Sequence, residues 1–358
     1  MKASILTILF VFFAAVAYVI WHLWRLTPGG WGPKLAVSLL FVLWMAAAFA
    51  SLGLRSRAPV SLITALYEIG HPWMIAWLYL LMAFLLADLG VLLGLIPKSV
   101  LAGNGWTMVS LTGVIALVLA AGGIHYHHKY REELTIHTEK ALPRPLTVVL
   151  ASDLHLGYSN RKGELLRWIE LINAENPDLV LFGGDVVDIQ VRPLLEGNFA
   201  EAFARLQAPV YTVLGNHEYI GQERDAEKFF AEAGITLLRD SVARFEGLTL
   251  IGRDDRSNPR RKPLSQLVPD TEGFSILLDH QPFHLEEAEA AGIDFQFSGH
   301  THRGQVWPLS WVTDAMYECS WGHHQRGNTR YYVSSGLGIW GPKIRIGTRS
   351  EYLVLHIQ

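Results

Sequence analysis

The stretch LTVVLASDLHLG, residues 146–157, joins a run of apolar residues directly to side chains that can bind metals. Its first six residues are aliphatic or β-branched, which is typical of a buried strand. Asp153 and His155 follow immediately after this predicted strand. Because binding groups are commonly carried by the loops that follow core elements, we expect a functional site at the end of the strand.

Two later stretches repeat this arrangement of an apolar run and a polar end. They are PDLVLFGGDVVD, residues 177–188, and APVYTVLGNHEY, residues 208–219. Residues 162–174 have apolar positions at helical spacing and precede a proline, so a helix is predicted between the first two strands. The pattern predicts a layered α/β architecture with polar groups at the strand ends. These groups are Asp185, Asp188, Asn216, His217 and Glu218.

Two histidine-bearing segments complete the series. LLDHQP, residues 277–282, places His280 after an apolar run, and GHTHRGQ, residues 299–305, places His300 and His302 two residues apart. Residues two apart in an extended segment point the same way, so these two imidazoles can converge on one place. The flanking glycines allow close approach of the backbone.

The carboxylate, amide and imidazole groups of these segments suit a centre of two divalent cations. Two ions that share a bridging carboxylate need about this many donors, with positions left for water and substrate. The mixed donor set favours manganese, iron or zinc over calcium, and it contains no thiolate. Each segment alone has a structural explanation, but the ordered series favours a metal site. The candidate ligands are Asp153, His155, Asp185, Asn216, His280, His300 and His302.

The first 125 residues or so contain long apolar runs instead of short strands with polar ends. The mean hydropathy of the whole chain is +0.22. Four runs are long enough to cross a bilayer as helices, which takes about 20 residues. Tryptophans near the ends of the runs support these boundaries. The first run is too long for a signal peptide and no cleavage site follows it, so we expect a retained helix. The predicted spans are residues 3–21, 35–54, 73–96 and 106–124.

Charge and cysteine content predict the setting of the protein. Lysines and arginines in short loops are modestly more numerous on the side of the N-terminus, which predicts a cytoplasmic N-terminus and, after four crossings, a cytoplasmic soluble part. The lone Cys319 cannot form an internal disulfide, which fits a reducing compartment. The formal charge of −3 argues against a nucleic-acid partner. We expect a multi-pass protein of a bacterial inner membrane or a plasma membrane, in an oligomeric state that the sequence leaves open.

The acidic residue Asp88 lies inside the third predicted span. A carboxylate in a membrane helix is costly, so it marks either a functional site or a polar contact with a neighbouring helix. Its off-centre position favours the contact.

The ordered segments resemble the five sequence blocks of the calcineurin-like metallophosphoesterases. SDLHLG, GGDVVD, GNHE, LDH and GHTHRGQ occur in this order between residue 146 and the C-terminal region. The closing YYVSSGLGIWGPKIRIG, residues 331–347, is similar to a bacterial branch that includes membrane-associated phosphodiesterases and UDP-2,3-diacylglucosamine hydrolases. The resemblance implies a four-layer αββα sandwich, preceded here by an all-α domain of four transmembrane helices. The expected boundaries are 1–124 for the membrane domain, 125–145 for a linker and first strand, and 146–358 for the catalytic domain.

The resemblance also implies a role for each site residue. One cation would be held by Asp153, His155, Asp185 and His302, and the other by Asp185, Asn216, His280 and His300. A hydroxide held between the cations would attack phosphorus in line. His217 would donate a proton to the leaving oxygen or stabilise developing charge. Asp188 and Glu218 would support the site, whereas Arg303 either contacts phosphate or is a solvated loop charge.

The function expected from the sequence is hydrolysis of a phosphodiester or pyrophosphate bond by a membrane-embedded enzyme. An amphipathic substrate, such as a lipid-linked nucleotide or a phospholipid, is favoured because a soluble one would not require four membrane helices. The alternatives are a tethered hydrolase of soluble nucleotides or phosphoproteins, and a noncatalytic scaffold, which the complete ligand set disfavours. Three further segments have open roles: the histidine tracts 125–128 and 323–324, and the charged loop 253–263, which either rims the site or is solvated. The alternating segment 131–140 is expected to pair as a strand.

Overall fold

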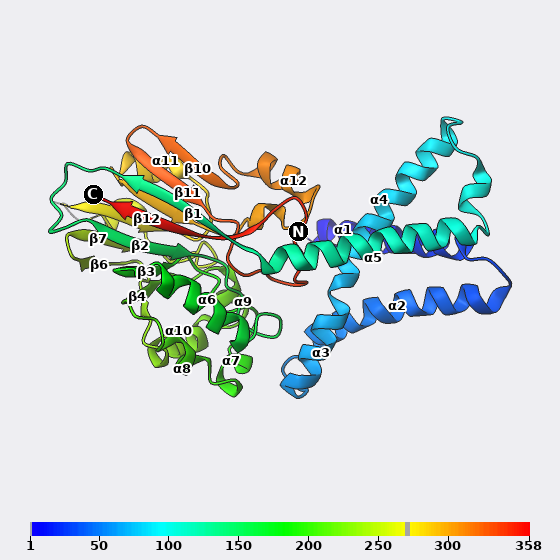
Figure 1. Cartoon of the computed structure of the whole chain (residues 1–358), viewed down its shortest axis with the longest axis horizontal. Coiled ribbons are helices and arrows are strands. Elements are labelled where there is room, and N and C mark those ends of the chain that lie inside the picture. Colours follow the sequence, from blue (N-terminus) through cyan, green and yellow to red (C-terminus); the bar gives the residue numbers. More distant parts are fainter. Residues whose placement is uncertain (1, 269–272) are drawn as a thin grey trace. The chain divides into compact units, whose positions relative to one another are not determined.

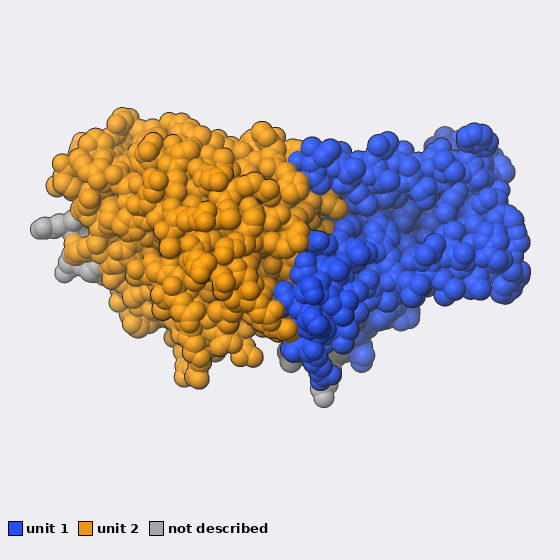
Figure 2. All heavy atoms as spheres, turned by 60° about the horizontal axis from the view of Figure 1, so that its bottom comes forward, with its two compact units in different colours: residues 1–124 blue, residues 125–358 orange. Residues whose placement is uncertain are grey.

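The computed structural model describes residues 2–268 and 273–358 and divides into two compact units, residues 1–124 and residues 125–358. Figure 1 labels the helices and strands along the chain, and Figure 2 colours the two units separately. The first unit is entirely helical, and the second contains all the strands of the described chain.

The helical unit contains four candidate membrane spans, Leu6–Leu26, Trp31–Leu54, Val60–Leu92 and Gly105–His127, which agrees with the predicted number. The third differs from the predicted 73–96 because a separate helix over residues 60–70 precedes Pro72, and because the helix that begins at Pro72 ends at Leu92. The elements are α1 (Lys2–Leu26), α2 (Trp31–Leu54), α3 (Val60–Gly70), α4 (Pro72–Leu92), η1 (Lys98–Leu101) and α5 (Gly105–His127).

Asp88 of α4 forms polar contacts with α1. The Tyr18 hydroxyl donates to its carboxylate at 2.6 Å, and His22 Nε2 lies 3.0 Å from the same oxygen. The acid therefore has hydrogen-bond partners on a neighbouring helix, which is the structural role that the sequence favoured.

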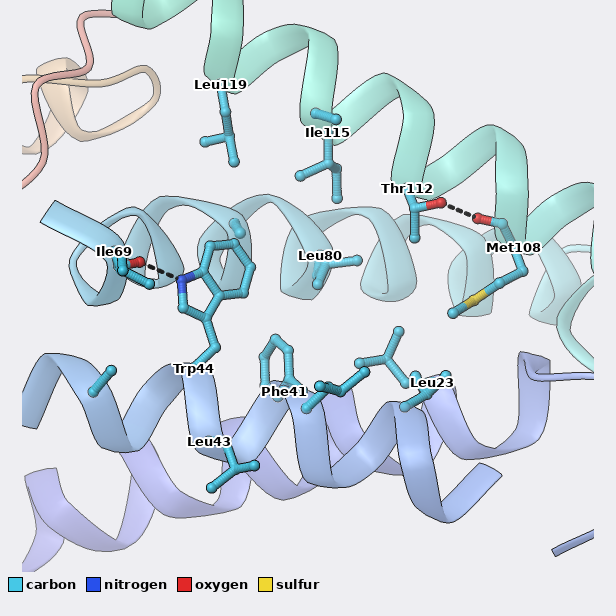
Figure 3. Close-up of a pocket in the computed structure, with 15 residues that line it drawn as sticks. Leu23, Phe41, Leu43, Trp44, Ile69, Leu80, Met108, Thr112, Ile115 and Leu119 are labelled. Carbon is cyan, nitrogen blue, oxygen red and sulfur yellow. Dashed lines mark hydrogen bonds between the residues drawn. The ribbon is translucent and has the colours of Figure 1, made fainter. Parts of the chain in front are cut away.

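An apolar pocket of about 620 Å³, open to the surface of the helical unit, lies among α1, α2, α4 and α5 (Figure 3). Leu23, Phe41, Leu80 and Ile115 contribute to its lining from these four helices. Its polar side chains are paired locally, since Trp44 Nε1 donates to the Ile69 carbonyl at 2.6 Å and the Thr112 hydroxyl donates to the Met108 carbonyl at 2.8 Å. The pocket therefore presents an almost entirely apolar surface.

The catalytic unit is built on two six-stranded sheets (Figure 1). In the first sheet β2, β3, β4 and β5 are parallel, and β1 pairs in parallel with β12 at the other edge. Its order is β1 (Lys129–Ile136), β12 (Ser350–Ile357), β2 (Leu146–Ala151), β3 (Leu179–Phe182), β4 (Val210–Thr212) and β5 (Thr236–Leu237). The second sheet has the order β10 (Gly322–Arg326), β11 (Thr329–Val333), β9 (Phe295–Ser298), β8 (Phe274–Leu278), β7 (Leu248–Gly252) and β6 (Ser241–Phe245).

The two sheets pack face to face through a core that includes Val148, Leu181, Ile276 and Phe297. Helices α6 (Lys162–Ala174), α7 (Arg192–Glu196), α8 (Phe199–Phe203) and α10 (Glu223–Glu232) cover the outer face of the first sheet, where Trp168 and Phe229 are buried. Helix α11 (Leu285–Ala290) and η2 (Leu264–Gln266) cover the second sheet. This arrangement is the αββα sandwich that the sequence predicted. The remaining elements are α9 (Asn216–Ile220), η3 (His302–Gly304) and α12 (Leu309–Met316).

Candidate metal centre

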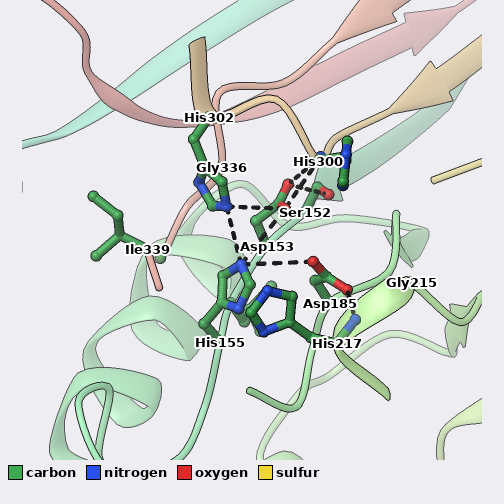
Figure 4. Close-up of polar contacts among 12 residues, drawn as sticks. Ser152, Asp153, His155, Asp185, Gly215, His217, His300, His302, Gly336 and Ile339 are labelled. Carbon is green, nitrogen blue, oxygen red and sulfur yellow. Dashed lines mark hydrogen bonds and ion pairs between the residues drawn. The ribbon is translucent and has the colours of Figure 1, made fainter. Parts of the chain in front are cut away.

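The predicted ligands gather at the carboxyl ends of strands from both sheets (Figure 4). Asp153 and His155 follow β2, Asp185 follows β3, and Asn216 begins the short helix after β4. His280 follows β8 of the second sheet, and His300 and His302 follow β9. Parallel strands end at the same edge of a sheet, so segments far apart in the sequence deliver their side chains to one place.

Three donors form a first group at β2 and β9. Asp153, His155 and His302 each offer one ligand atom, and these atoms all lie within 4.8 Å of one another. His302 Nε2 lies 3.0 Å from His155 Nε2 and 3.4 Å from Asp153 Oδ1. Two imidazole nitrogens that face each other at this distance beside a carboxylate can hold a cation between them.

A second group consists of Asp185, His280 and His300. His280 Nδ1 donates to the Gly183 carbonyl at 2.8 Å, which leaves Nε2 facing Asp185 Oδ2 at 3.1 Å. His300 Nδ1 lies 2.7 Å from Asn216 Oδ1, which adds an amide oxygen to this group. Asp185 Oδ2 is also 3.7 Å from His155 Nε2 in the first group. The carboxylate of Asp185 therefore lies between the two donor groups.

The donor atoms have too few partners within the protein, which indicates that they bind cations. His280 Nε2, the ligand atom that faces Asp185, is buried without a hydrogen-bond partner. Asp153 and Asp185 are fully buried, and no lysine or arginine of the described chain forms an ion pair with either. Because buried carboxylates need a compensating charge, the two groups match a pair of divalent cations.

The side chains of the two groups shift one another's pKa values. Burial alone would raise the pKa of Asp153, but the neighbouring His302 and His155 lower it below its usual range. Burial would lower the pKa of His155, yet Asp153 and Asp188 raise it to about 10. At His300, burial and the nearby His280 together lower the pKa to about 4, so this imidazole is neutral and can act as a ligand.

The backbone at the site adopts conformations that few residues tolerate. Asp153, His155, Asp185, His300 and His302 have φ values of 56°, 43°, 50°, 71° and 47°, in the left-handed region. Such residues each cost about 1–3 kcal/mol and cluster at functional sites, where the surrounding structure imposes them. In this backbone conformation, the two ligands of one short loop, such as Asp153 and His155, both point toward the metal centre.

Two glycines are required by close contacts. A Cβ at residue 299 would lie 1.9 Å from the Ser152 hydroxyl oxygen, and a Cβ at residue 215 would lie 2.1 Å from Asp185 Oδ1. Any side chain at these positions would displace the loops that carry the ligands. The predicted close approach at Gly299 is therefore present in the structure.

His217 lies beside the centre and is oriented by Asp188. The carboxylate of Asp188 accepts a hydrogen bond from His217 Nδ1 at 3.0 Å and lies 3.4 Å from His155 Nδ1. The half-buried ring of His217 also comes within ligand distance of His155 and Asp185. Its second nitrogen is thus available at the edge of the centre, where a proton donor would act on bound substrate.

Two residues hold the ligand loops through their backbone groups. Glu218 accepts hydrogen bonds from the amides of Gly215 at 2.7 Å, Val187 at 2.8 Å and Asp185 at 3.1 Å. The fully buried Arg345 donates to the carbonyls of His302 at 2.8 Å and Gly338 at 3.1 Å. Sequence reasoning suggested a supporting role for Glu218 but missed Arg345, because carbonyl acceptors leave no signal in the sequence.

Arg303 points elsewhere in the structure. Its guanidinium lies over the Trp321 ring at 4.1 Å, and no described contact joins it to the donor groups. A role in phosphate binding therefore remains a prediction. The histidine tracts 125–128 and 323–324 contribute to none of the possible metal clusters among the described residues.

The charged loop 253–263 is buried at its start and exposed over much of its remainder. Arg253 is buried and lies 3.1 Å from Asp279 and 2.7 Å from Glu287, while Asp254 accepts from Tyr219 at 2.6 Å. Arg256, Arg260 and Lys262 are exposed, as expected of a solvated segment.

Comparisons with known proteins agree with this geometry. Residues 146–304 match the family of calcineurin-like phosphoesterases. The chain is 31% identical over 282 residues to a transmembrane protein with metallophosphoesterase domain from Danio rerio, covering 71% of this chain and 63% of that protein. It is 30% identical over 236 residues to a metallophosphoesterase from Helicobacter pylori, covering 63% of each. The match thus spans less than two thirds of either relative.

Among solved structures, an archaeal phosphodiesterase matches with 15% identity and a TM-score of 0.34, over 54% of this chain and 85% of that one. The family match and the donor groups both lie in the second unit. Residues 146–304 of this unit are similar to the calcineurin-like phosphoesterases, and the unit contains the two groups of His/Asp donors. The same chain contains four candidate membrane spans.

Proposed function

We propose that this protein is a membrane-embedded hydrolase of a phosphodiester or pyrophosphate bond. The observation that carries the proposal is the position of the Asp185 carboxylate between two groups of nitrogen and oxygen donors. Asp153, His155 and His302 would hold one divalent cation together with Asp185. Asn216, His280 and His300 would hold the second, again with Asp185.

The chemistry divides between the cations and the side chains. When bound, two divalent cations supply a nucleophile derived from water at neutral pH and neutralise phosphate oxygens. His217, held by Asp188, would give a proton to the leaving oxygen. The imidazole-rich donor set suits manganese, with iron and zinc as alternatives.

The substrate that we propose is amphipathic. Four candidate membrane spans in the same chain support this choice, because a lipid must be taken from the bilayer whereas a soluble nucleotide need not be. A lipid-linked nucleotide such as a UDP-acyl sugar is the first candidate, in line with the similarity of the C-terminal segment to UDP-2,3-diacylglucosamine hydrolases. A phospholipid is the second. Soluble nucleotides or phosphoproteins are the competing substrates.

The proposed location of the catalytic unit is the cytoplasmic face of an inner or plasma membrane. The modest excess of short-loop lysine and arginine on the side of the N-terminus supports this orientation. The buried free Cys319 fits the same reducing compartment.

The proposal is tested with detergent-solubilised full-length protein. Chelation should abolish hydrolysis of a chromogenic phosphodiester, and manganese should restore it better than magnesium because imidazole favours the softer ion. Incubation with extracted membrane lipids, followed by mass spectrometry, should reveal a hydrolysed amphipathic phosphoester that is absent with the Asn216→Ala variant. Full activity after exhaustive chelation would overturn the metal assignment, and turnover of soluble phosphoesters alone would overturn the lipid assignment.

A further inference from the structure

Helix α12, Leu309–Met316, presents apolar side chains to the surface of the catalytic unit. Leu309, Val312 and Met316 follow the i, i+3, i+7 spacing that normally faces a core, yet they are 40%, 52% and 61% exposed. Ser310 of the same helix is buried. The apolar stripe of this helix therefore faces outward, although Ser310 is buried.

Tryptophans extend this surface. Trp311 is 65% exposed and packs edge to face with the exposed Trp307, with ring centroids 5.4 Å apart. We call these five residues, Trp307, Leu309, Trp311, Val312 and Met316, the α12 patch. Five other large apolar side chains are exposed in the described part of this unit, and none of them belongs to α12. They are Leu171, Leu195, Ile220, Val242 and Trp340.

The α12 patch is attached to the metal-ligand loop. The Thr301 hydroxyl, between His300 and His302, donates to the Ser320 carbonyl at 2.6 Å, and the Ser320 hydroxyl donates to Asp314 of α12. Gly304 packs so closely on the start of α12 that a Cβ there would lie 2.3 Å from the Leu309 carbonyl carbon. These contacts join the α12 patch to the loop that carries the ligands His300 and His302. Binding at the patch would therefore affect the position of that loop.

We propose that the α12 patch is a docking surface for a lipid bilayer, into which it inserts its apolar side chains at the headgroup boundary. Tryptophan with aliphatic side chains on a short helix is the composition of interfacial segments. Arg303 beside the patch forms no ion pair among the described residues and supplies a cation for anionic headgroups. Clustered exposed apolar residues of this kind mark a binding surface rather than chance exposure.

The membrane helices of the chain keep the catalytic unit close to a bilayer, which makes the bilayer the favoured partner of the patch. Helix α5, the last candidate span, ends at His127, and β1 of the catalytic unit begins at Lys129. A single residue therefore joins a membrane helix to this unit in every molecule. A soluble partner or a second copy would have to be recruited, whereas the lipid surface is tethered to the patch by the covalent chain.

The test uses full-length Trp311→Cys protein in vesicles of phosphatidylethanolamine and phosphatidylglycerol, labelled with an environment-sensitive NBD dye. The native Cys319 is buried, so the dye reports on residue 311. The matched control is Val242→Cys, because Val242 is an exposed apolar residue of β6 outside the patch. A second label, at Met316→Cys, guards against a local effect of replacing tryptophan.

Interfacial helices lie about 5–10 Å into the boundary of headgroups and acyl chains. Nitroxide groups on the upper acyl chains should therefore quench the dye at 311 and 316 at least about twofold more than at 242. Quenching by aqueous iodide alone would show an exposed patch in water and would overturn the proposal. Protection from both quenchers would show a patch covered by protein and would overturn it equally. The readout does not depend on turnover, so it is independent of the proposed function.

Discussion

Replacement of Glu218 by glutamine tests whether the ligand loops are held by their backbone amides. In the structure Oε2 accepts from the amides of Gly215 and Asp185, and Oε1 accepts from the amide of Val187. Glutamine preserves the shape but offers only one acceptor oxygen. In the better of its two orientations the oxygen serves Gly215 and Asp185, and the amide nitrogen then faces the N–H of Val187.

The magnitude follows from the single buried amide that loses its partner. An unsatisfied buried donor costs about 1–3 kcal/mol. For a unit of this size each kcal/mol lowers the unfolding temperature by about 2–4 °C. Because the affected loop carries Asp185, we also expect cation affinity to fall by about 10–100-fold, as is usual when a residue that orients a ligand is changed.

The assay measures thermal unfolding and cation affinity, by competition with a chelator, at about pH 8.5, well above ordinary carboxyl values. This condition keeps Glu218 ionised, since burial and Asp185 raise its pKa to about 7. Glu232→Gln, at the exposed end of α10, is the control and should change stability by less than about 0.5 kcal/mol. If the Glu218→Gln variant has the unfolding temperature and the cation affinity of the wild type, Glu218 does not hold the ligand loops.

Three further predictions follow from single contacts. His217→Ala should keep its metal content, measured by atomic emission, but lose about a hundredfold or more in turnover; a loss of metal would make His217 a ligand. Gly215→Ala places a Cβ 2.1 Å from Asp185 Oδ1, and displacing that carboxylate by about 1 Å should lower turnover about a hundredfold; unchanged kinetics would contradict this. Burial raises the pKa of Cys319 to about 11. Iodoacetamide should therefore label the native protein at pH 8 about a hundredfold more slowly than the unfolded chain. Equally rapid labelling of the native protein would show that Cys319 is not buried.

The core strands and most of the ligands could be predicted because each sequence motif contains an apolar strand followed directly by the polar residues of the site. β2, β3 and β9 appear in the sequence as short apolar runs, and Asp153, Asp185 and His300 follow them within a few residues. Hydropathy likewise predicted four membrane spans, since burial in lipid demands uninterrupted apolar length. These features depend on neighbours in the sequence.

The features that escaped prediction depend on partners distant in the sequence. Arg345 binds backbone carbonyls more than thirty residues away as well as nearby ones, and any arginine could do so. The spacing of Leu309, Val312 and Met316 is that of a buried face, so the sequence gives no sign that the stripe is exposed. Helix α3, Val60–Gly70, lies between the predicted spans 35–54 and 73–96 and was not predicted.

The site and the scaffold depend on each other energetically. The burial of Asp153 and Asp185 and the left-handed backbone at the ligands oppose folding, and neighbouring histidines offset only part of this cost when no cation is present. The two-sheet core, with side chains such as Val148 and Phe297 fully buried, supplies the compensating free energy. Cations bound at Asp185 and its neighbours would relieve that cost in the folded state only, so metal binding and folding of the catalytic unit are thermodynamically linked. The residues that make the centre reactive are therefore the ones that make the unloaded protein least stable.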